Sequence, residues 1–486
     1  MCTPCSALSS LLIFVAVACL ATSYQAQAQG GVDLATCKAA SEIPTSADRS
    51  GQASEIARAV YDIREEARAA KLDDALNTAQ ALVQKYPSEA SLQAVLGEVY
   101  YRRGELAQAV PAINRAVQLD PCYPRAHFDA WQVFELTGMR RTGQQQLDIA
   151  RQLDGKDTVI DWAWEHDKGQ FESGNGIECR LVGEPAIATI RLDPRKNQSN
   201  LRAGASLAVR VNGRSTQLVM DSSDPAITLS EADAKRAGIV AEHTFTSAPH
   251  AATGSSSISG YTSHIKILQI GSITLENCPV TVIVSPPVAE GGIGFEPFHD
   301  FRITIDVQHE RLALGPLPPI PLSARASSGT ASPTEDRIIP VEFKDWLRFY
   351  QPPTMHRALL PVKLGNAGTH LFILDTGSST SYIDPDAARE VTHVSRDFAA
   401  KVSGYGGMEN DVYNADKVQL QVGAVSRTYE PMQSWSKATK SDAAGIRVSG
   451  ILGFDLVRDL IIQIDYRDLL IDLEPNGEEI RKSSHE

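Results

Sequence analysis

The chain has 486 residues, which is enough for two to four domains. Its hydrophobic content of 43% and charged content of 22% are ordinary for a folded, soluble protein. The formal net charge is −13 and no block of basic residues occurs, which argues against a nucleic-acid partner.

The first 28 residues predict an export signal. They carry no charged side chain, and their apolar run ALSSLLIFVAVACLA is short for a membrane span. Ala26-Gln27-Ala28 offers a small-x-small cleavage site, so we expect a signal peptide over 1–28 and a linker over 29–49. The mature protein would be periplasmic or secreted, with no membrane span. The alternative is an anchor, because Cys19 after Ala16-Val17-Ala18 resembles a lipoprotein attachment site without the usual Leu.

Four of the seven cysteines remain after such a cleavage. They are too far apart for the spacing of a metal site, so no metal is predicted. Export would allow one disulfide, but so few cysteines in a large chain favour buried or incidental thiols. The four are Cys37, Cys122, Cys179 and Cys278.

Residues 50–157 are predicted to be helical and to repeat every 34 residues. Pro87 and Pro121 lie one period apart, and the same period relates Ala70, Gly104 and Gly138. This pattern resembles the tetratricopeptide (TPR) repeat, in which pairs of helices stack. The resemblance implies a surface that docks a protein partner. A helical spacer, or a brace for the neighbouring domain, is the alternative, and both stay open. A connector over 158–185 follows.

From about residue 186 short alternating apolar runs and Gly-rich turns predict strands. A Pro/Ser-rich linker over 316–336 separates two blocks, 186–315 and 337–474, and a tail over 475–486 ends the chain. The first block contains LAVRVNGRSTQLVMDSSDPAITLS, and the second contains LPVKLGNAGTHLFILDTGSSTSYI. Later, GFEPFHDFRITID in the first matches GFDLVRDLIIQID in the second. Two matched segments in the same order predict a duplication.

The second block resembles the aspartic peptidase family in its retropepsin-like and pepsin-like forms. The marks are Asp375-Thr376-Gly377-Ser378-Ser379 and, downstream, Ile451-Leu452-Gly453. Over roughly 186–474, the resemblance implies an all-β, bilobal fold of two β-barrels, each supplying one Asp on a tight loop. It also implies a flap over the substrate. We expect that flap at 402–413, with Tyr405 and Gly406, and a second at 251–261.

The partner of Asp375 is expected at Asp221, which ends the run TQLVM. Ser222, Ser223 and Asp224 follow it where the family has Thr, Gly and Ser. Ser222 is a tolerable hydroxyl, but Ser223 adds a Cβ at a crowded point. Asp224 adds a negative charge that should raise the pKa of Asp221. The first lobe is therefore predicted to carry a degenerate loop.

Two adjacent carboxyl groups can share one proton because they cannot both ionise. The ionised member would take a proton from a held water, and the protonated one would donate to the peptide carbonyl. The resemblance thus implies an exported endopeptidase that acts on extended polypeptide and needs no metal or organic cofactor. Three arrangements stay open. Asp221 and Asp375 pair within one chain, two second blocks pair between chains, or the cleft binds peptide without hydrolysing it.

Overall fold

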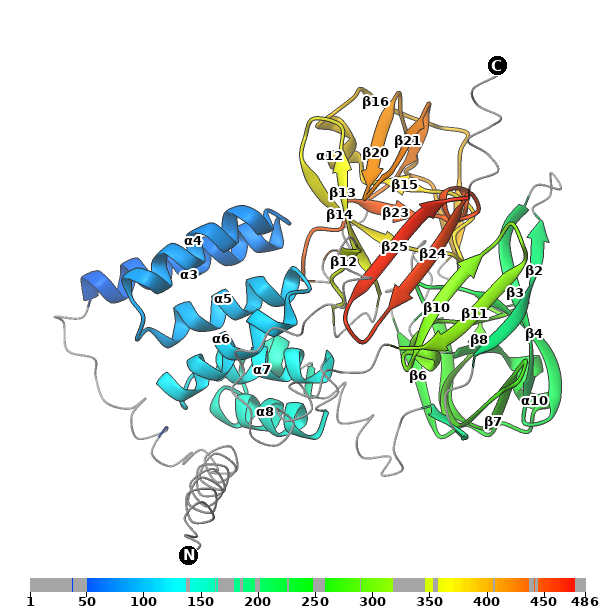
Figure 1. Ribbon diagram of the computed structural model, residues 1–486, viewed down its shortest axis with the longest axis horizontal. Helices are drawn as coiled ribbons and strands as arrows, with labels where there is room; N and C mark the ends of the chain where they lie inside the picture. Colours follow the sequence, from blue (N-terminus) through cyan, green and yellow to red (C-terminus); the bar gives the residue numbers. More distant parts are fainter. Residues whose placement is uncertain are drawn as a thin grey trace, which may run out of the picture.

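The computed structural model combines an arm of helices with two lobes of β-sheet, as Figure 1 shows. Its described residues are 37, 50–136, 140–161, 163–164, 179–183, 187–196, 202–224, 227–247, 258–288, 290–317, 346–352, 357–404, 407–436, 441 and 445–476. The predicted signal peptide with Cys19, nearly all of both linkers and most of the tail lie outside them. The expected fold class, helical repeats followed by a bilobal all-β region, is confirmed.

The helical arm consists of three helix pairs. Helices α4, α6 and α8 begin 34 residues apart, as do α5 and α7, which confirms repeats of the predicted period. Gly97 lets the middle pair approach closely, since a Cβ there would lie 2.4 Å from Ile113 Cγ1. The pairs are α3 (Ser50–Arg68) with α4 (Leu72–Lys85), α5 (Ala90–Arg102) with α6 (Leu106–Leu119), and α7 (Pro124–Leu136) with α8 (Arg140–Leu153).

The first block folds into lobe one, which carries two short helical segments, α10 (Glu231–Arg236) and η2 (Glu296–Phe298). The described part of the first predicted flap, residues 258–261, begins strand β7. The strands are β1 (Arg180–Leu181), β2 (Ala188–Lys196), β3 (Arg202–Val211), β4 (Arg214–Met220), β5 (Ile227–Ser230), β6 (His243–Ser247), β7 (Ile258–Ile270), β8 (Ile273–Ser285), β9 (Gly291–Ile293), β10 (Phe301–Asp306) and β11 (Arg311–Pro316).

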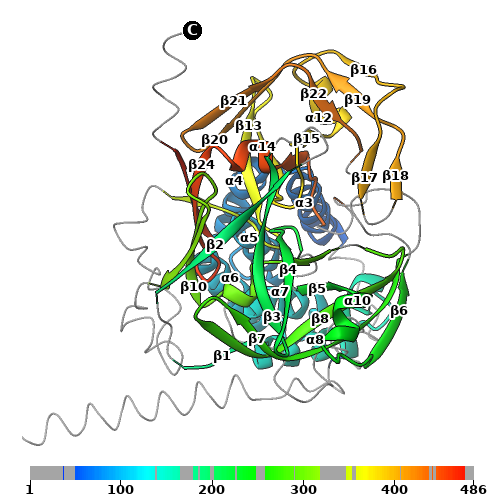
Figure 2. The ribbon, with the colours of Figure 1, turned by 90° about the vertical axis from the view of Figure 1, so that its right-hand side faces the viewer.

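The second block folds into lobe two, with helices α12 (Pro385–Arg389) and α14 (Phe454–Val457). Its strands are β12 (Leu347–Arg348), β13 (Leu359–Leu364), β14 (Thr369–Leu374), β15 (Tyr382–Ile383), β16 (Val394–Arg396), β17 (Val402–Gly404), β18 (Gly407–Glu409), β19 (Tyr413–Ala415), β20 (Val418–Val422), β21 (Val425–Tyr429), β22 (Met432–Ser434), β23 (Gly450–Leu452), β24 (Leu460–Asp465) and β25 (Leu470–Pro475). In the view of Figure 2, this lobe lies above lobe one.

The two lobes repeat one topology. In lobe one, β4 pairs in parallel with β9, which comes about 70 residues later along the chain. In lobe two, β14 pairs in parallel with β23 in the same way. Parallel neighbours need a long crossover, so the same rare feature in both lobes supports the duplication.

A shared sheet joins the lobes through the antiparallel pair β10 and β24. Thr304 is directly opposite Gln463 in this pair. These two residues occupy the same place in the repeated segments, ten residues after Gly294 and Gly453 respectively. An approximate two-fold axis therefore passes through the pair and relates the lobes.

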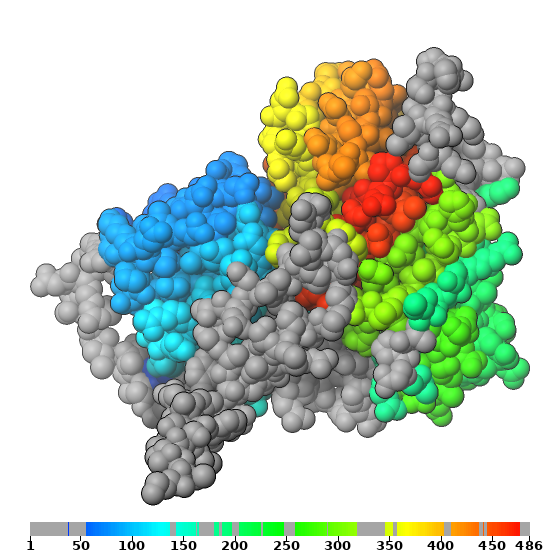
Figure 3. Space-filling model, in the orientation of Figure 1, coloured from blue at the N-terminus to red at the C-terminus, as the bar shows by residue number. Residues whose placement is uncertain are grey.

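The helical arm packs against lobe two, and Figure 3 shows the two side by side. The ring of Tyr101 in α5 meets that of Tyr350 at 5.2 Å, and its hydroxyl donates to Gln351 O at 3.2 Å. One continuous apolar core includes Leu106 and Ile113 of the arm together with strands of both lobes. The arm is thus a brace on this face. In the described part of the chain, no helix is long and apolar enough to cross a bilayer.

The four cysteines after residue 28 form two disulfides, Cys37 with Cys122 and Cys179 with Cys278. The interpretation as incidental thiols is wrong. That interpretation rested on the low density of cysteine in the sequence. The fold nevertheless brings together cysteines that are 85 and 99 residues apart in the sequence. The first bond ties the segment before α3 to the turn before α7, and the second ties the connector to β8.

Candidate active site

Strands β4 and β14 deliver Asp221 and Asp375 to the junction between the lobes. Five of the six residues of β14 are buried, so the strand is fixed by packing on both faces. Each Asp begins its loop by donating its N–H to the strand that passes beside it. Asp375 N donates to Leu452 O at 2.9 Å, and Asp221 N donates to Ile293 O at 3.0 Å.

The two Asp loops are held together by a reciprocal set of hydrogen bonds between Thr376 and Ser222. Thr376 Oγ1 donates to Met220 O at 2.9 Å and accepts from Ser222 N at 3.0 Å. Ser222 Oγ donates to Leu374 O at 2.8 Å and accepts from Thr376 N at 3.0 Å. Ser222 therefore fully replaces the expected threonine, and both hydroxyls are buried and satisfied.

Asp375 is 5% exposed and is oriented by its own loop. Its Oδ1 accepts from Gly377 N at 3.1 Å and from Ser378 N at 2.8 Å. Two N–H donors on one carboxylate oxygen fix the orientation of the carboxyl group. The Ser378 hydroxyl does not join them, since it donates to Thr380 O at 2.9 Å.

Asp221 accepts hydrogen bonds from one loop residue, Ser223, through its N–H and its hydroxyl. Ser223 N donates to its Oδ1 at 2.8 Å, whereas Asp224 N donates to the main-chain oxygen of Asp221 at 3.0 Å. The carboxylate of Asp224 accepts from Thr228 Oγ1 at 2.6 Å. Burial, then the charge of Asp375, then that of Asp224 raise the pKa of Asp221 to about 7. The effect predicted for Asp224 is thus confirmed in direction.

Gly377 lies at the point where the loop of lobe two meets the carboxyl group of Asp221. A Cβ on Gly377 would lie 2.5 Å from Asp221 Cγ and 2.6 Å from its Oδ2. The carboxyl group of lobe one therefore rests directly on the main chain of the lobe two loop. The residue at the matching place in lobe one is Ser223, which is buried and carries a Cβ. The junction is consequently asymmetric.

Arg357 contributes a contact that the sequence did not suggest. Its Nε donates to Ser223 O, so a cation from lobe two holds the degenerate loop of lobe one. Arg357 belongs to no motif and precedes β13, so no pattern in the sequence marks it.

Ser381 supports the loop of Asp375 from behind. Like Arg357, it was not predicted from the sequence. Its Oγ accepts from Gly453 N at 2.9 Å and donates to Asp455 Oδ1 at 2.7 Å. Tyr429 OH donates to Ser381 Oγ at 3.1 Å.

A hairpin of lobe two occupies the place predicted for the flap. Strands β17 and β18 pair from Val402↔Glu409 to Gly404↔Gly407, and in Figure 2 they project toward lobe one. Tyr405 and Gly406, which come between these strands in the sequence, lie outside the described residues.

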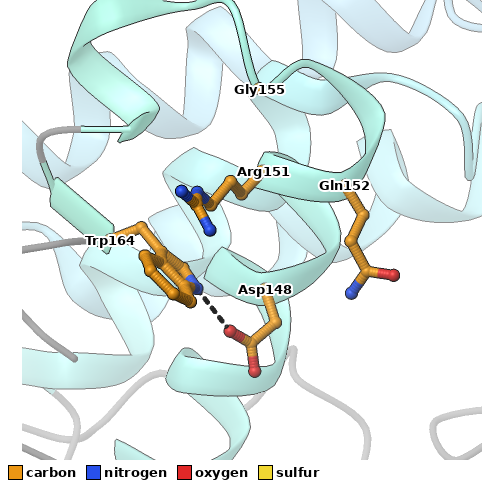
Figure 4. A pocket seen from close by; sticks show the side chains of 5 residues that line it. All are labelled: Asp148, Arg151, Gln152, Gly155 and Trp164. Carbon is orange, nitrogen blue, oxygen red and sulfur yellow. Dashed lines mark hydrogen bonds between the residues drawn. The ribbon is translucent and has the colours of Figure 1, made fainter.

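A hollow of about 250 Å³ lies away from the Asp pair, on the last helical repeat (Figure 4). Arg151 lies over the ring of Trp164 at 3.6 Å from its centre, and Trp164 Nε1 donates to Asp148 Oδ1 at 2.7 Å. These contacts pair Asp148, Arg151 and Trp164 with one another within the arm. Across the described residues, no group of three His, Cys, Asp or Glu could hold a metal ion.

Thr376→Val is expected to loosen the contact between the lobes. It would leave Met220 O and Ser222 N buried without partners, which costs about 2–5 kcal/mol of the free energy of unfolding. Urea unfolding measures the loss. Thr369→Val, at the exposed start of β14, is the control and should change stability little. Equal losses in both variants would show that the reciprocal hydrogen bonds do not hold the lobes together.

A segment of lobe one is similar to a family of aspartic proteases. Residues 207–294 match a family model described as "gag-polyprotein putative aspartyl protease". The matched segment includes Asp221 and stops before the second lobe, and it confirms the resemblance to retropepsin-like proteases. A search of curated proteins finds no match.

Two solved structures are similar to the chain. The aspartic proteinase from Irpex lacteus shares 11% identity, with 60% of this chain and 98% of that chain covered and a TM-score of 0.38. The retropepsin-like aspartic protease from Rickettsia conorii shares 16% identity, with 28% of this chain and 94% of that chain covered and a TM-score of 0.20.

Proposed function

We propose that the protein is an aspartic-type endopeptidase that cleaves extended polypeptide with Asp221 and Asp375 of one chain. The observation that carries the proposal is the reciprocal hydrogen bonding of Thr376 and Ser222, which places both carboxyl groups at one junction. That geometry favours a pair within the chain over a pair of second lobes from two chains. No step of the reaction calls on a metal or an organic cofactor.

The two carboxyl groups have different roles in this proposal. Asp375, which accepts from two main-chain N–H groups, is the ionised member and takes a proton from the attacking water. Asp221, whose pKa is raised to about 7, keeps the shared proton and donates it to the carbonyl oxygen of the scissile peptide. The water oxygen bonds to the carbonyl carbon and a gem-diol forms. Asp375, now protonated, donates its proton to the peptide nitrogen as the C–N bond breaks, and Asp221 takes a proton back from a gem-diol hydroxyl, which leaves a carboxylic acid and an amine.

The experiment that tests this function is cleavage of an unfolded polypeptide by the purified mature chain. We expect new internal peptide ends, identified by mass spectrometry, that are absent when both aspartates are replaced by Asn. If the wild-type chain and the double variant give the same peptides across pH 4–8, the protein is not a peptidase of this type.

A peptide-binding module without activity is the second candidate, and a specific observation favours it. Ser223 and Asp224 replace the Gly and Ser that the second lobe has, so Asp221 is bonded by the N–H and the hydroxyl of Ser223, while Asp224 N donates to the main-chain oxygen of Asp221. In that case unfolded peptides would bind equally well to the wild-type chain and to the double Asn variant, and neither would cleave them.

Export to the periplasm or the medium is part of the proposal, with a lipid anchor at Cys19 as the alternative. Two disulfides support an oxidising compartment, because cytosolic thiols are kept reduced. Mass spectrometry of the purified mature chain distinguishes cleavage after Ala28 from a lipid-modified Cys19. A partner docked on the helical arm also remains a proposal.

Asp224→Ser is expected to shift the alkaline limit of activity to lower pH. Asp221 must hold its proton, so activity falls as pH rises through its pKa of about 7. The charge of Asp224 raises that pKa, and removing the charge should move the limit down by roughly 0.5–1 pH unit. The profile of kcat/KM against pH measures it, with the exposed Asp386→Asn as control. An unmoved limit in Asp224→Ser would mean that Asp221 does not set it.

A further inference from the structure

A short segment of lobe two, residues 445–449, lies between the helical arm and the loop of Asp375. In Figure 1 the orange chain that enters β23 passes along the ends of the helices. Two main-chain contacts fix it to the arm. Arg102 Nη1 donates to Gly445 O at 2.6 Å, and Arg447 N donates to Arg68 O at 2.6 Å.

Arg102 is held rigidly for this contact. It is 7% exposed, and its second nitrogen donates to Glu98 Oε1 at 2.9 Å. Glu98 also accepts from Arg64 at 2.9 Å and lies 3.5 Å from Arg125. These cations lower the pKa of Glu98 despite its burial, so the carboxylate stays ionised and anchors the guanidinium. The fork of Arg102 thus joins the middle repeat to Gly445.

The segment then leads directly into the support of Asp375. Ser449 N donates to Leu371 O at 2.8 Å, and β23 continues beside β14 up to Leu452. Leu452 O accepts the N–H of Asp375 itself at 2.9 Å. Only seven residues separate Gly445 from the carbonyl that positions the carboxylate.

A second path runs through side chains of lobe two. Arg447 Nη2 pairs with Glu390 at 3.0 Å, and the other oxygen of Glu390 lies 3.4 Å from His370 Nε2. His370 Nδ1 lies 3.0 Å from Ser449 Oγ. His370 belongs to β14, five residues before Asp375. Both paths end on the strand that carries the carboxylate.

We infer that Arg102 is a positioning residue for Asp375, and that the helical arm holds the catalytic loop of lobe two in place through residues 445–449. The inference deepens the proposed function, on which its effect on catalysis rests. It also gives the arm a use that needs no external partner: the arm completes the support that β23 provides. A displacement of catalytic groups by about 1 Å can lower a rate a hundredfold, so such support affects turnover.

Hydrogen exchange of main-chain amides in Arg102→Ala tests the inference without requiring activity. We expect exchange over 371–375 and 449–454 to accelerate about tenfold or more, because loss of the Gly445 contact makes local opening easier. The matched control is Arg103→Ala, since Arg103 is the next residue of the arm and, among the described residues, forms ion pairs with Glu105 and Asp73. It should leave those segments unchanged.

Equal protection of 371–375 and 449–454 in wild type and a folded Arg102→Ala would overturn the inference. If Arg102→Ala does not fold, the same exchange measurement is made on Arg102→Lys. Lys keeps a positive charge beside Glu98, but it lacks the planar guanidinium that bonds Glu98 and Gly445 O at the same time. Unchanged protection in the folded Lys variant would equally overturn it.

Kinetics add a second readout, with kcat expressed per folded chain so that a smaller folded fraction does not count as slower turnover. Arg102→Ala should lower kcat about tenfold or more with KM unchanged, since the substrate cleft is untouched. If the wild-type chain cleaves nothing, the proposed function fails, yet the exchange result still decides whether the arm holds the loop. A tenfold rise in KM with unchanged kcat would count against the inference.

Discussion

Asp375→Asn is expected to abolish peptide cleavage, with a fall in kcat of about a thousandfold or more. The amide cannot take a proton from water, and it lacks the charge that keeps the proton on Asp221. Its shape is nearly that of the carboxylate, so Gly377 N and Ser378 N still have an oxygen to bind. The fold should therefore survive, and circular dichroism with urea unfolding should show it.

Asp221→Asn should lower kcat to a similar extent, because the proton donor is lost. A mixture of the Asp221→Asn and Asp375→Asn chains should remain inactive, since each site needs both aspartates from one chain. Full activity of Asp221→Asn alone would instead support pairing of second lobes from two chains. The exposed Asp386→Asn serves as the control for both variants.

Gly377→Ala is the second variant with a large expected effect. Its Cβ would lie 2.5 Å from Asp221 Cγ, closer than nonbonded carbon atoms come, so the carboxyl group or the loop must move. We expect a loss of about 1–3 kcal/mol in stability from overpacking. We also expect kcat to fall about a hundredfold, because the shift occurs at the reacting groups.

Gly315→Ala is a suitable control for that variant, since a Cβ at Gly315 would meet no atom within 4 Å. Stability and kcat are the two measurements. If Gly377→Ala matches Gly315→Ala in both, the carboxyl group of Asp221 does not rest on the lobe two loop. Ser223→Gly makes the opposite change at the matching place and should not lower kcat.

Much of the fold could be predicted because local patterns determine it. The 34-residue period fixes where α4, α6 and α8 begin, and the matched segments predict a duplication, which the same parallel pairing of β4 and β14 in the two lobes supports. Each pattern lies within one stretch of chain. The pairing of β10 with β24 could not be predicted, because it depends on how the two lobes meet.

The same limit applies to the site. Asp375 and its loop could be predicted from the motif around them. Asp221 could be predicted because the first β-rich block repeats the plan of the second. Arg357 could not be predicted, because its partner is the main-chain oxygen of Ser223, 134 residues away. Every residue has a main-chain carbonyl, so the sequence does not show which one accepts a hydrogen bond from a distant side chain.

The disulfides and the brace are likewise contacts at long range. Cysteine counting could not pair Cys37 with Cys122, since 85 residues separate them. Nor could it be predicted that Arg102 reaches Gly445, 343 residues later along the chain. Such contacts depend on the assembled arm and lobes, whereas the motifs depend on local chemistry.

The central claim is that the two lobes bring the carboxyl groups of Asp221 and Asp375 together. Titration of the Asp221 carboxyl group by ¹³C NMR, in wild type and in Asp375→Asn, tests this claim most directly. In the wild-type chain the Asp221 signal should titrate near pH 7, and in Asp375→Asn it should titrate at clearly lower pH, because the neighbouring charge is gone. An Asp221 signal that titrates at the same pH in both proteins would contradict the account.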